Sequence, residues 1–524
     1  GIMAGVNMSG DLKDPAKSIP KGTFMAVGVG YLIYMVVPFF FAYRADAATL
    51  VGDNMIMQRL AYWGIAIIMG IWGATLSSAV GSLLGAPRVL QALVLDKVLP
   101  SKLSFLSKGS GPENIPRAAT IFTSIIALVL VIVGDLNMIA PILTMFFLTT
   151  YGTLNLTSGI ETMLQSPSFR PKFRVHWMFS LLGTIGCIAV MFLINALATI
   201  VAIVFIAGVY VWLRRRGLQT TFGDVTRGLH LQIVRYALLR LESKETDAKN
   251  WRPNFLVLSG MPTKRWHLID FAYGIAQEKG LITVATILPE KGITQERITN
   301  HAHNITTSLR EKNIKTLVRV TTATDPYTGS KQLVNSYGLG SLVPNTILLG
   351  DTEEDSHHNS YCNMISHFYQ SNRNVIILQN DFKLEFAGAK QIDLWWGGLK
   401  GNGGFMMIIA HLVKTSPRWD NIKVCVKMVV STEEAAQGTR ENLKSILEEM
   451  RVDFDYNIIV SQGRRFWDIL EEESKDSSIV MMGLKEPDDD FANYYKQLKQ
   501  NTSGVNNKVF FLASEHIEFK DVLN

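Results

Sequence analysis

The sequence predicts an α-helical membrane bundle followed by an α/β region of two parallel-sheet lobes. Apolar segments of about 20 residues, the length that crosses a bilayer as a helix, recur through residues 1–213. Residues 214–524 alternate short apolar strands with helical patterns, which indicates parallel sheets with crossover helices. The charges divide in the same way, because only 13 of the 51 Lys and Arg and 8 of the 45 Asp and Glu fall in the first region.

The apolar segments are separated by loops of alternating charge. The segments lie near residues 23–43, 62–90, 118–134, 137–160, 177–194 and 196–213. Every second loop carries Lys and Arg, and the series ends with Arg214, Arg215 and Arg216. Positive side chains accumulate in cytoplasmic loops. We therefore expect a multi-pass protein of the cell membrane in which everything after Arg216 is cytoplasmic.

Residues 64–95 carry two rows of small side chains at four-residue spacing. Such rows let helices approach closely in lipid, so we expect this helix to be packed on more than one side. Ala74, Ser77 and Ser78 lie at i, i+3 and i+4 and share one face. Two hydroxyl oxygens and a backbone carbonyl suit a small monovalent cation that has lost its water. The alternative is that the serines pack, or bond back to the preceding turn.

Two further positions suggest anion ligands. Gly1 and Gly5 in the opening GIMAG indicate a helix broken at membrane depth, where free N–H groups hold anions in transporters. A close-packing glycine motif is the alternative. Tyr151 lies inside an apolar segment and its phenol could donate to an anion, although packing against neighbours is the commoner role. Because the chain opens on an apolar stretch without an initiator Met, we expect a fragment that lacks its N-terminal part.

The α/β region begins after an amphipathic helical pattern over residues 217–242. Strands are expected near residues 255–259, 281–288, 315–320, 345–350, 374–379, 392–396, 421–430, 456–460, 478–483 and 508–513. The predicted domains are a partial transmembrane transport domain (1–213), a connecting helix and linker (214–250), and two α/β lobes (251–390 and 391–524).

Composition and motifs argue against several functions. Nearly equal numbers of basic and acidic residues after residue 214 argue against a nucleic-acid partner. Cys187, Cys362 and Cys425 lack the paired spacing of a disulfide framework or a zinc site. The glycine-rich stretch 397–404 matches neither a Walker A loop nor a dinucleotide fingerprint, so we favour a tight turn over a phosphate cradle.

No catalytic residue, cofactor or resident metal is predicted. His301, His303 and the stretch 355–358 could suggest a metal, but no paired ligands accompany them and surface polarity is the favoured explanation. The carboxylates, serines and histidines after residue 214 form no recognisable triad or acid pair. We therefore do not expect an enzyme.

An ordered set of motifs resembles the cation-chloride cotransporters, a branch of the amino acid-polyamine-organocation superfamily, and in particular its sodium-potassium-chloride members. The motifs are GIMAG with SGDLKDPAKSIPKGT, ATLSS with GAPRVLQAL, LNMIAPILTMFFLTTYGTLN, and SPSFRPKFR. The resemblance implies the second part of a LeuT-type inverted-repeat fold, from half of the sixth helix to the twelfth. It also implies paired lobes like universal stress proteins, which regulate and form a homodimer.

The resemblance also implies ligands, position by position. Sodium would be held at Ala74, Ser77 and Ser78, and the serine pair is lacking in the sodium-independent branch. Chloride would be held by the backbone amides of Gly1, Ile2 and Met3 with Tyr151. Most potassium ligands and the other chloride site would precede Gly1, so potassium dependence is inferred from the family alone.

The function implied is electroneutral symport of Na⁺, K⁺ and Cl⁻ by alternating access, with the ions and the lipid bilayer as partners and no cofactor. Two alternatives remain. One is a sodium-chloride or amino-acid carrier of the same superfamily. The other is a nucleotide-sensing α/β domain tethered to a membrane anchor.

Overall fold

The computed structural model describes most of the chain. The described residues are 12–53, 55–111, 114–134, 136–164, 169–171, 173, 175–215, 225–243, 247–261, 265–277, 279–352, 355–379, 389–397, 401–419, 421–449, 451–505, 507–514 and 522. The chain divides into two compact units, Gly1–Ile233 and Val234–Asn524. The finer domain boundaries given above stay predictions.

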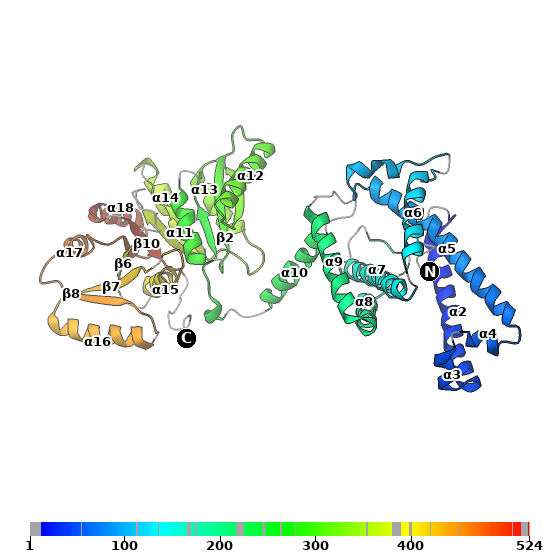
Figure 1. The fold of residues 1–524 in the computed structure, drawn as a ribbon. Helices are drawn as coiled ribbons and strands as arrows, with labels where there is room; N and C mark the ends of the chain where they lie inside the picture. The colour runs from blue at the N-terminus through cyan, green and yellow to red at the C-terminus, as the bar shows by residue number, and fades with distance from the viewer. Residues whose placement is uncertain are drawn as a thin grey trace. The chain divides into compact units, whose positions relative to one another are not determined.

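The first unit is helical (Figure 1). Its helices are α2 (Pro15–Arg44), α3 (Ala47–Gly52), α4 (Ile56–Leu60), α5 (Gly64–Leu95), the 3₁₀ helix η2 (Ser101–Ser107), α6 (Arg117–Val133), α7 (Leu136–Leu164), α8 (Trp177–Ile194) and α9 (Ala196–Arg215). Within the described ranges, α2, α5, α7, α8 and α9 are long and apolar enough to cross a membrane, and α6 is apolar but shorter. At most 17% of the most apolar stretch of each long helix is buried, so these helices present a surface suited to lipid. The unit is a membrane unit, as predicted.

The first unit contains two groups of packed helices. Helix α5 contacts α4, η2 and α6, and Gln91 Nε2 donates a hydrogen bond of 3.0 Å to the carbonyl of Ser107. Helix α7 contacts α8 and α9. Glycine allows α7 and α8 to approach closely: a Cβ added at Gly183 would lie 3.1 Å from Cγ of Asn155.

The second unit alternates strands with helices. Its strands are β1 (Phe255–Leu258), β2 (Ile282–Pro289), β3 (Leu317–Ala323), β4 (Thr346–Gly350), β5 (Asn374–Gln379), β6 (Gln391–Trp395), β7 (Lys423–Val430), β8 (Asp455–Val460), β9 (Ile479–Gly483) and β10 (Lys508–Leu512). Its helices are α11 (Trp266–Ala276), α12 (Gln295–Glu311), α13 (Pro326–Ser336), α14 (His358–Gln370), α15 (Asn402–Lys414), α16 (Glu433–Glu449), α17 (Phe466–Glu473) and α18 (Phe491–Asn501), and α10 (Val225–Glu242) precedes them. Every strand predicted from the sequence is present, within three residues of its expected ends. The predicted fold class is confirmed.

The two predicted lobes share one continuous sheet. Its strand order is β3-β2-β1-β4-β5-β10-β9-β6-β7-β8, and all neighbours are parallel except β5 and β10. Each half is therefore a five-stranded parallel sheet, and the halves join where β5 and β10 run antiparallel, with Phe510 opposite Ile377. The lobes are two halves of one three-layer unit.

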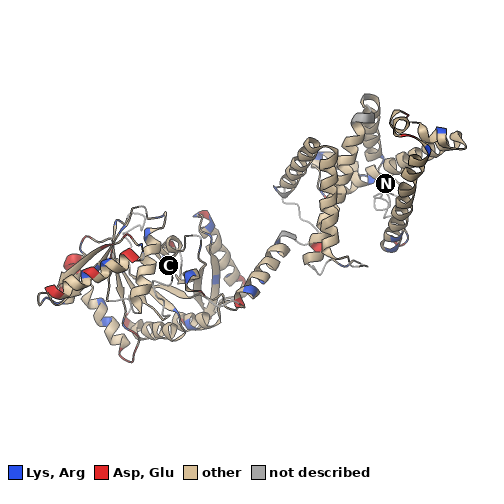
Figure 2. Cartoon of the chain, turned by 90° about the horizontal axis from the view of Figure 1, so that it is seen from below, with Lys and Arg blue, Asp and Glu red and all other residues tan. Residues whose placement is uncertain are grey.

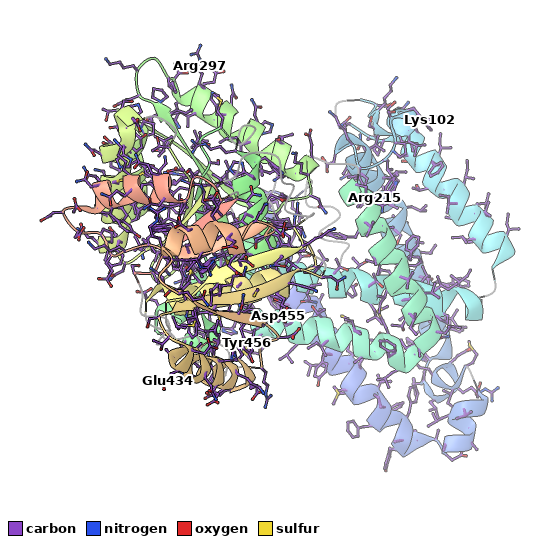
Figure 3. All side chains as sticks on the ribbon, turned by 90° about the vertical axis from the view of Figure 1, so that its left-hand side faces the viewer. Lys102, Arg215, Arg297, Glu434, Asp455 and Tyr456 are labelled. Atoms are coloured by element: carbon purple, nitrogen blue, oxygen red, sulfur yellow. The ribbon has the colours of Figure 1, made fainter. Side chains whose placement is uncertain are left out.

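Helices cover both faces of this sheet. One apolar core packs α11, α12, α15 and α16 against one face, and a second packs α13, α14, α17 and α18 against the other. Charged side chains are frequent over this unit and sparse along the spans of the first (Figure 2). At the sheet edge, α16 contacts β8, whose first residues Asp455 and Tyr456 are labelled in Figure 3.

Candidate functional site

Ala74, Ser77 and Ser78 lie in the continuous helix α5, so their spacing places them on one exposed face. In the described part of the chain, neither serine hydroxyl has a hydrogen-bond partner. Their neighbour Thr75 differs, because its Oγ1 donates to the carbonyl of Ile71 at 2.8 Å. Among the described residues, back-bonding is thus seen at Thr75, and the role of the serine pair stays a prediction.

The rows of small residues on α5 lie mostly open. A Cβ added at Gly70, Gly73 or Gly81 would meet no atom within 4 Å. The buried residues of α5 lie towards its C-terminal end: Gly85, Pro87, Gln91 and Val94. Among the described residues, α5 contacts α4, η2 and α6, and the expectation that it is packed on more than one side stays a prediction.

Tyr151 is half-buried in α7 and stacks on Phe147, with ring centroids 6.2 Å apart. No described residue hydrogen-bonds its phenol. The structure places Tyr151 and the serine pair on separate groups of helices, since α7 packs on α8 and α9. Gly1, Ile2 and Met3 lie outside the described residues.

A first cavity of about 400 Å³ lies at the carboxyl ends of β1, β2 and β4. It is lined by residues that follow these strands, among them Ser259, Gly260, Arg265, Asp351 and Tyr361. In the sheet, β2 lies on one side of β1 and β4 lies on the other, so the order of the strands changes direction at β1. Ligands of open α/β sheets bind at such a change of direction. Sequence reasoning missed this cavity, although the turn residues directly after β1 and β4 were a usable signal.

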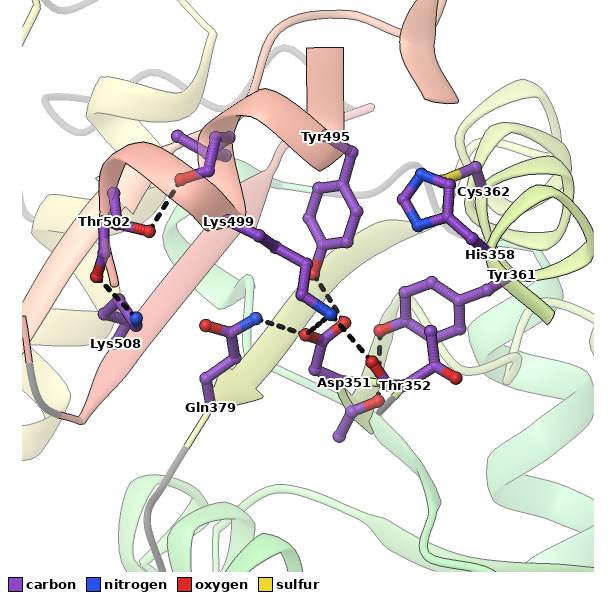
Figure 4. A network of polar contacts seen from close by, with 12 residues as sticks. Asp351, Thr352, His358, Tyr361, Cys362, Gln379, Tyr495, Lys499, Thr502 and Lys508 are labelled. Carbon is purple, nitrogen blue, oxygen red and sulfur yellow. Dashed lines mark hydrogen bonds and ion pairs between the residues drawn. The ribbon is translucent and has the colours of Figure 1, made fainter. Parts of the chain in front are cut away.

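Asp351 is the centre of a polar network beside the first cavity (Figure 4). Its carboxylate accepts hydrogen bonds from Gln379 Nε2 and, at 2.9 Å, from the Tyr495 hydroxyl, and it pairs with Lys499 Nζ at 2.8 Å. Lys499 also donates to the carbonyl of Thr352 at 2.8 Å. Burial, and then the charge of Asp351, raise the pKa of Tyr361 well above its usual value. The network fastens α18 to the end of β4.

A second cavity, of about 450 Å³, lies at the carboxyl ends of β6, β7 and β9. Its walls include Trp395, Trp396, Phe466, Trp467 and Lys485. The glycine-rich stretch 397–404 enters α15 here: Gly401 is the N-cap, with φ +63°, and residues 398–400 lie outside the described part. The favoured interpretation of this stretch as a turn stays a prediction.

A buried ion pair lies next to the second cavity. Lys427 Nζ lies 2.8 Å from Oδ2 of Asp393, whose side chain is fully buried. Lys427 also donates to the carbonyl of Glu473, near the end of α17, and Gln391 Nε2 donates to Asp393 Oδ1 at 2.9 Å. This pair was not predictable from the sequence, because Asp393 lies on β6 and Lys427 on β7, and α15 separates the two strands along the chain.

The histidines considered as metal ligands have other surroundings. His301 and His303 lie on α12. His358 Nε2 lies 2.7 Å from the carbonyl of Ala492, and its ring stacks on Tyr495. Across the described residues, no group of three or more His, Cys, Asp or Glu is arranged to hold a metal ion.

Two family models match the chain. That of the amino acid permeases matches residues 1–257, and that of solute carrier family 12 matches residues 265–391 and 382–466. Solute carrier family 12 comprises the cation-chloride cotransporters, the family that the motifs resemble. The chain belongs to the cation-chloride cotransporter family. The membrane unit and the α/β unit of this cotransporter thus each lie largely within one of the two matches.

The α/β unit of the cotransporter is also similar to solved structures. The cytoplasmic domain of a prokaryotic cation chloride cotransporter is 17% identical, with 51% of this chain and 98% of that chain covered and a TM-score of 0.38. A universal stress protein from Archaeoglobus fulgidus is 10% identical, with coverages of 50% and 97% and a TM-score of 0.36. A putative universal stress protein from Pseudomonas aeruginosa is 8% identical, with coverages of 50% and 94% and a TM-score of 0.33.

Proposed function

We propose that the cotransporter carries Na⁺, K⁺ and Cl⁻ together, by electroneutral symport with alternating access. The observation that carries this proposal is the serine pair Ser77 and Ser78 on α5. Ser77 and Ser78 present two hydroxyl oxygens without described partners on one helical face, together with the backbone of Ala74. Oxygen ligands of this kind replace the water around Na⁺ in transporters.

We also propose that chloride binds at the backbone amides of Gly1, Ile2 and Met3 and at the Tyr151 phenol. The phenol has a donor without a described partner, which supports this role. Potassium transport follows from family membership. The α/β unit is proposed to be cytoplasmic, from the alternating loop charges, and to form a homodimer that regulates transport.

The test is sodium-dependent uptake by the intact transporter that carries this sequence. Ser78→Ala removes one hydroxyl ligand, so we expect the sodium concentration for half-maximal transport to rise about tenfold or uptake to be lost. Thr75→Ala is the matched control, because that hydroxyl already donates to a carbonyl. Unchanged sodium dependence in Ser78→Ala contradicts the assignment.

A second candidate function is nucleotide sensing by the first cavity. Its position at the β1–β4 change of direction and the positive charge of Arg265 favour a phosphate-bearing ligand. Calorimetry of the full chain with ATP, AMP and cyclic dinucleotides tests it, with Arg265→Gln as the variant. Absence of binding at millimolar ligand removes this candidate. An amino-acid carrier instead predicts labelled amino-acid uptake that ignores chloride.

A further inference from the structure

Strand β3 lies at one end of the sheet, and its outer edge is free. It stands first in the strand order, so β2 is its one neighbour among the described strands. The carbonyl of Ala323 accepts a hydrogen bond from the backbone N–H of Glu290, directly after β2, so the backbone groups of Ala323 point towards β2. Along a strand, these groups point alternately to one side and the other. The N–H and C=O groups of Val318, Val320 and Thr322 therefore point away from the sheet.

The outward-pointing backbone groups of β3 can pair with a further strand. Each of the three residues offers one donor and one acceptor, and no described residue forms a hydrogen bond with them. Strand β3 has seven residues and contains no proline, which would remove a donor. A free edge of this length is a template on which an extended chain can add as a strand.

The amino end of β3 is positively charged. Residues 310–319 include four Lys or Arg, and the one acidic residue in this stretch is Glu311. Arg310 and Arg319 are exposed, and neither forms an ion pair with a described acidic residue. A second copy of this chain that paired through β3 would bring two such segments together, and like charges oppose this. A partner strand with acidic side chains is favoured instead.

A third cavity, of about 560 Å³, lies beside the amino end of β3. It is lined by the last turns of α12 and the first residues of β2 and β3, with apolar side chains from Leu281, Leu309, Ile314 and Leu317. Leu281 and Leu317 are exposed, at 43% and 54%. An extended chain that pairs with β3 and continues past its first residue can therefore bury an apolar side chain here.

We propose that the free edge of β3 binds an extended acidic peptide as a further strand of the sheet. The outward-pointing backbone groups of β3 hold the peptide by hydrogen bonds. Acidic side chains of the peptide lie near Arg319, and an apolar side chain enters the third cavity. This surface is separate from the two cavities at the carboxyl ends of the strands, and it does not depend on the transport proposal.

The experiment measures binding of a fluorescent probe peptide to the full chain in detergent micelles, by fluorescence anisotropy. The probe has blocked ends, begins with leucine and then alternates glutamate with valine. Two further probes carry N-methyl groups on all the valines or on all the glutamates, so the charge is the same in all three. Only alternate N–H groups of an added strand face β3, so we expect Kd to rise about tenfold for one methylated probe and to change little for the other.

The three probes distinguish strand pairing from attraction between charges. Equal affinity of all three probes shows that charge alone is recognised and overturns the proposal. An equal loss of affinity in both methylated probes also overturns it, because an added strand pairs through alternate residues. Absence of binding of the unmodified probe at millimolar concentration overturns it as well.

Two variants of the chain locate the surface. Arg319→Glu reverses the charge beside the added strand, so we expect Kd for the unmodified probe to rise about threefold or more. This side chain is exposed, so the substitution does not put folding at risk. Arg440→Glu, at an exposed position on α16, is the matched control and should leave Kd unchanged. Equal Kd values in the two variants overturn the assignment to β3.

Discussion

The Nζ atom of Lys499 lies 2.8 Å from Oδ2 of Asp351, so an ion pair ties the two halves of the α/β unit together. Lys499 lies on α18, in the second half, and Asp351 directly follows β4, in the first. Helix α18 also lines the second cavity through Tyr494 and Leu498, whereas Asp351 lines the first. A single helix thus contacts one cavity and is anchored beside the other.

Lys499→Met is expected to loosen α18. The Asp351 side chain is only 12% exposed, and the substitution removes its one positive partner in the described network. Leaving a buried charged acceptor short of a partner costs about 1–3 kcal/mol, so amides of α18 should exchange with solvent roughly tenfold faster or more. Hydrogen-exchange mass spectrometry measures this, with Lys496→Met on the same helix as the control. Equal exchange in both variants contradicts the role given to the pair.

Lys427→Met is expected to destabilise the α/β unit by about 3–5 kcal/mol, because it leaves the fully buried carboxylate of Asp393 unpaired. The double substitution Asp393→Leu with Lys427→Met removes both charges and should recover most of the loss. Urea unfolding of the chain, followed by tryptophan fluorescence, compares the three proteins. A double variant less stable than Lys427→Met speaks against a simple buried pair.

Stability should fall between pH 6.5 and about 4 through His267. Burial, and then the charge of Arg265, lower the pKa of this histidine from 6.5 to about 4. In this pH range the unfolded chain therefore binds a proton that the folded chain does not bind. The free energy of unfolding that is present above pH 6.5 is lost as the pH falls. Thermal unfolding at pH 7.5 and pH 5 should show a smaller difference in His267→Gln than in the unchanged chain. The exposed His301→Gln should behave like the unchanged chain.

Cys362 and Cys425 should resist alkylation in the folded chain. Burial, and then the Asp351 carboxylate, raise the pKa of Cys362 to about 12, and burial, and then Asp393, raise that of Cys425 to about 11. Because the thiolate is the reactive form, iodoacetamide at pH 8 should modify both only after denaturation. Mass spectrometry of peptides from native and guanidinium-treated chain measures the difference. Rapid labelling of native Cys362 disagrees with this account.

The order of elements was predictable because each signal is local. Apolar segments of bilayer length marked the membrane helices, and short apolar runs marked strands such as β4 and β9. The joining of the lobes was not predictable, since the β5–β10 pairing links residues more than a hundred positions apart and leaves no local pattern.

The candidate sites also include features that were predictable from the sequence and features that were not. The shared face of Ala74, Ser77 and Ser78 follows from helical spacing alone. The ion pair of Asp351 with Lys499 depends on the topology and could not be derived from the sequence. The same holds for the contact between the rings of Trp395 and Phe466. Turn residues after strands were the available signal for the cavities, but such turns are common in sheets without ligands.

The most direct test of the central claim is rubidium uptake into vesicles that hold the intact transporter carrying this sequence, with sodium and chloride removed in turn. Rubidium replaces potassium in this assay. If the three ions move together, uptake should fall to background when either sodium or chloride is absent. Rubidium that never enters, or that enters equally well without sodium or chloride, contradicts coupled transport of Na⁺, K⁺ and Cl⁻.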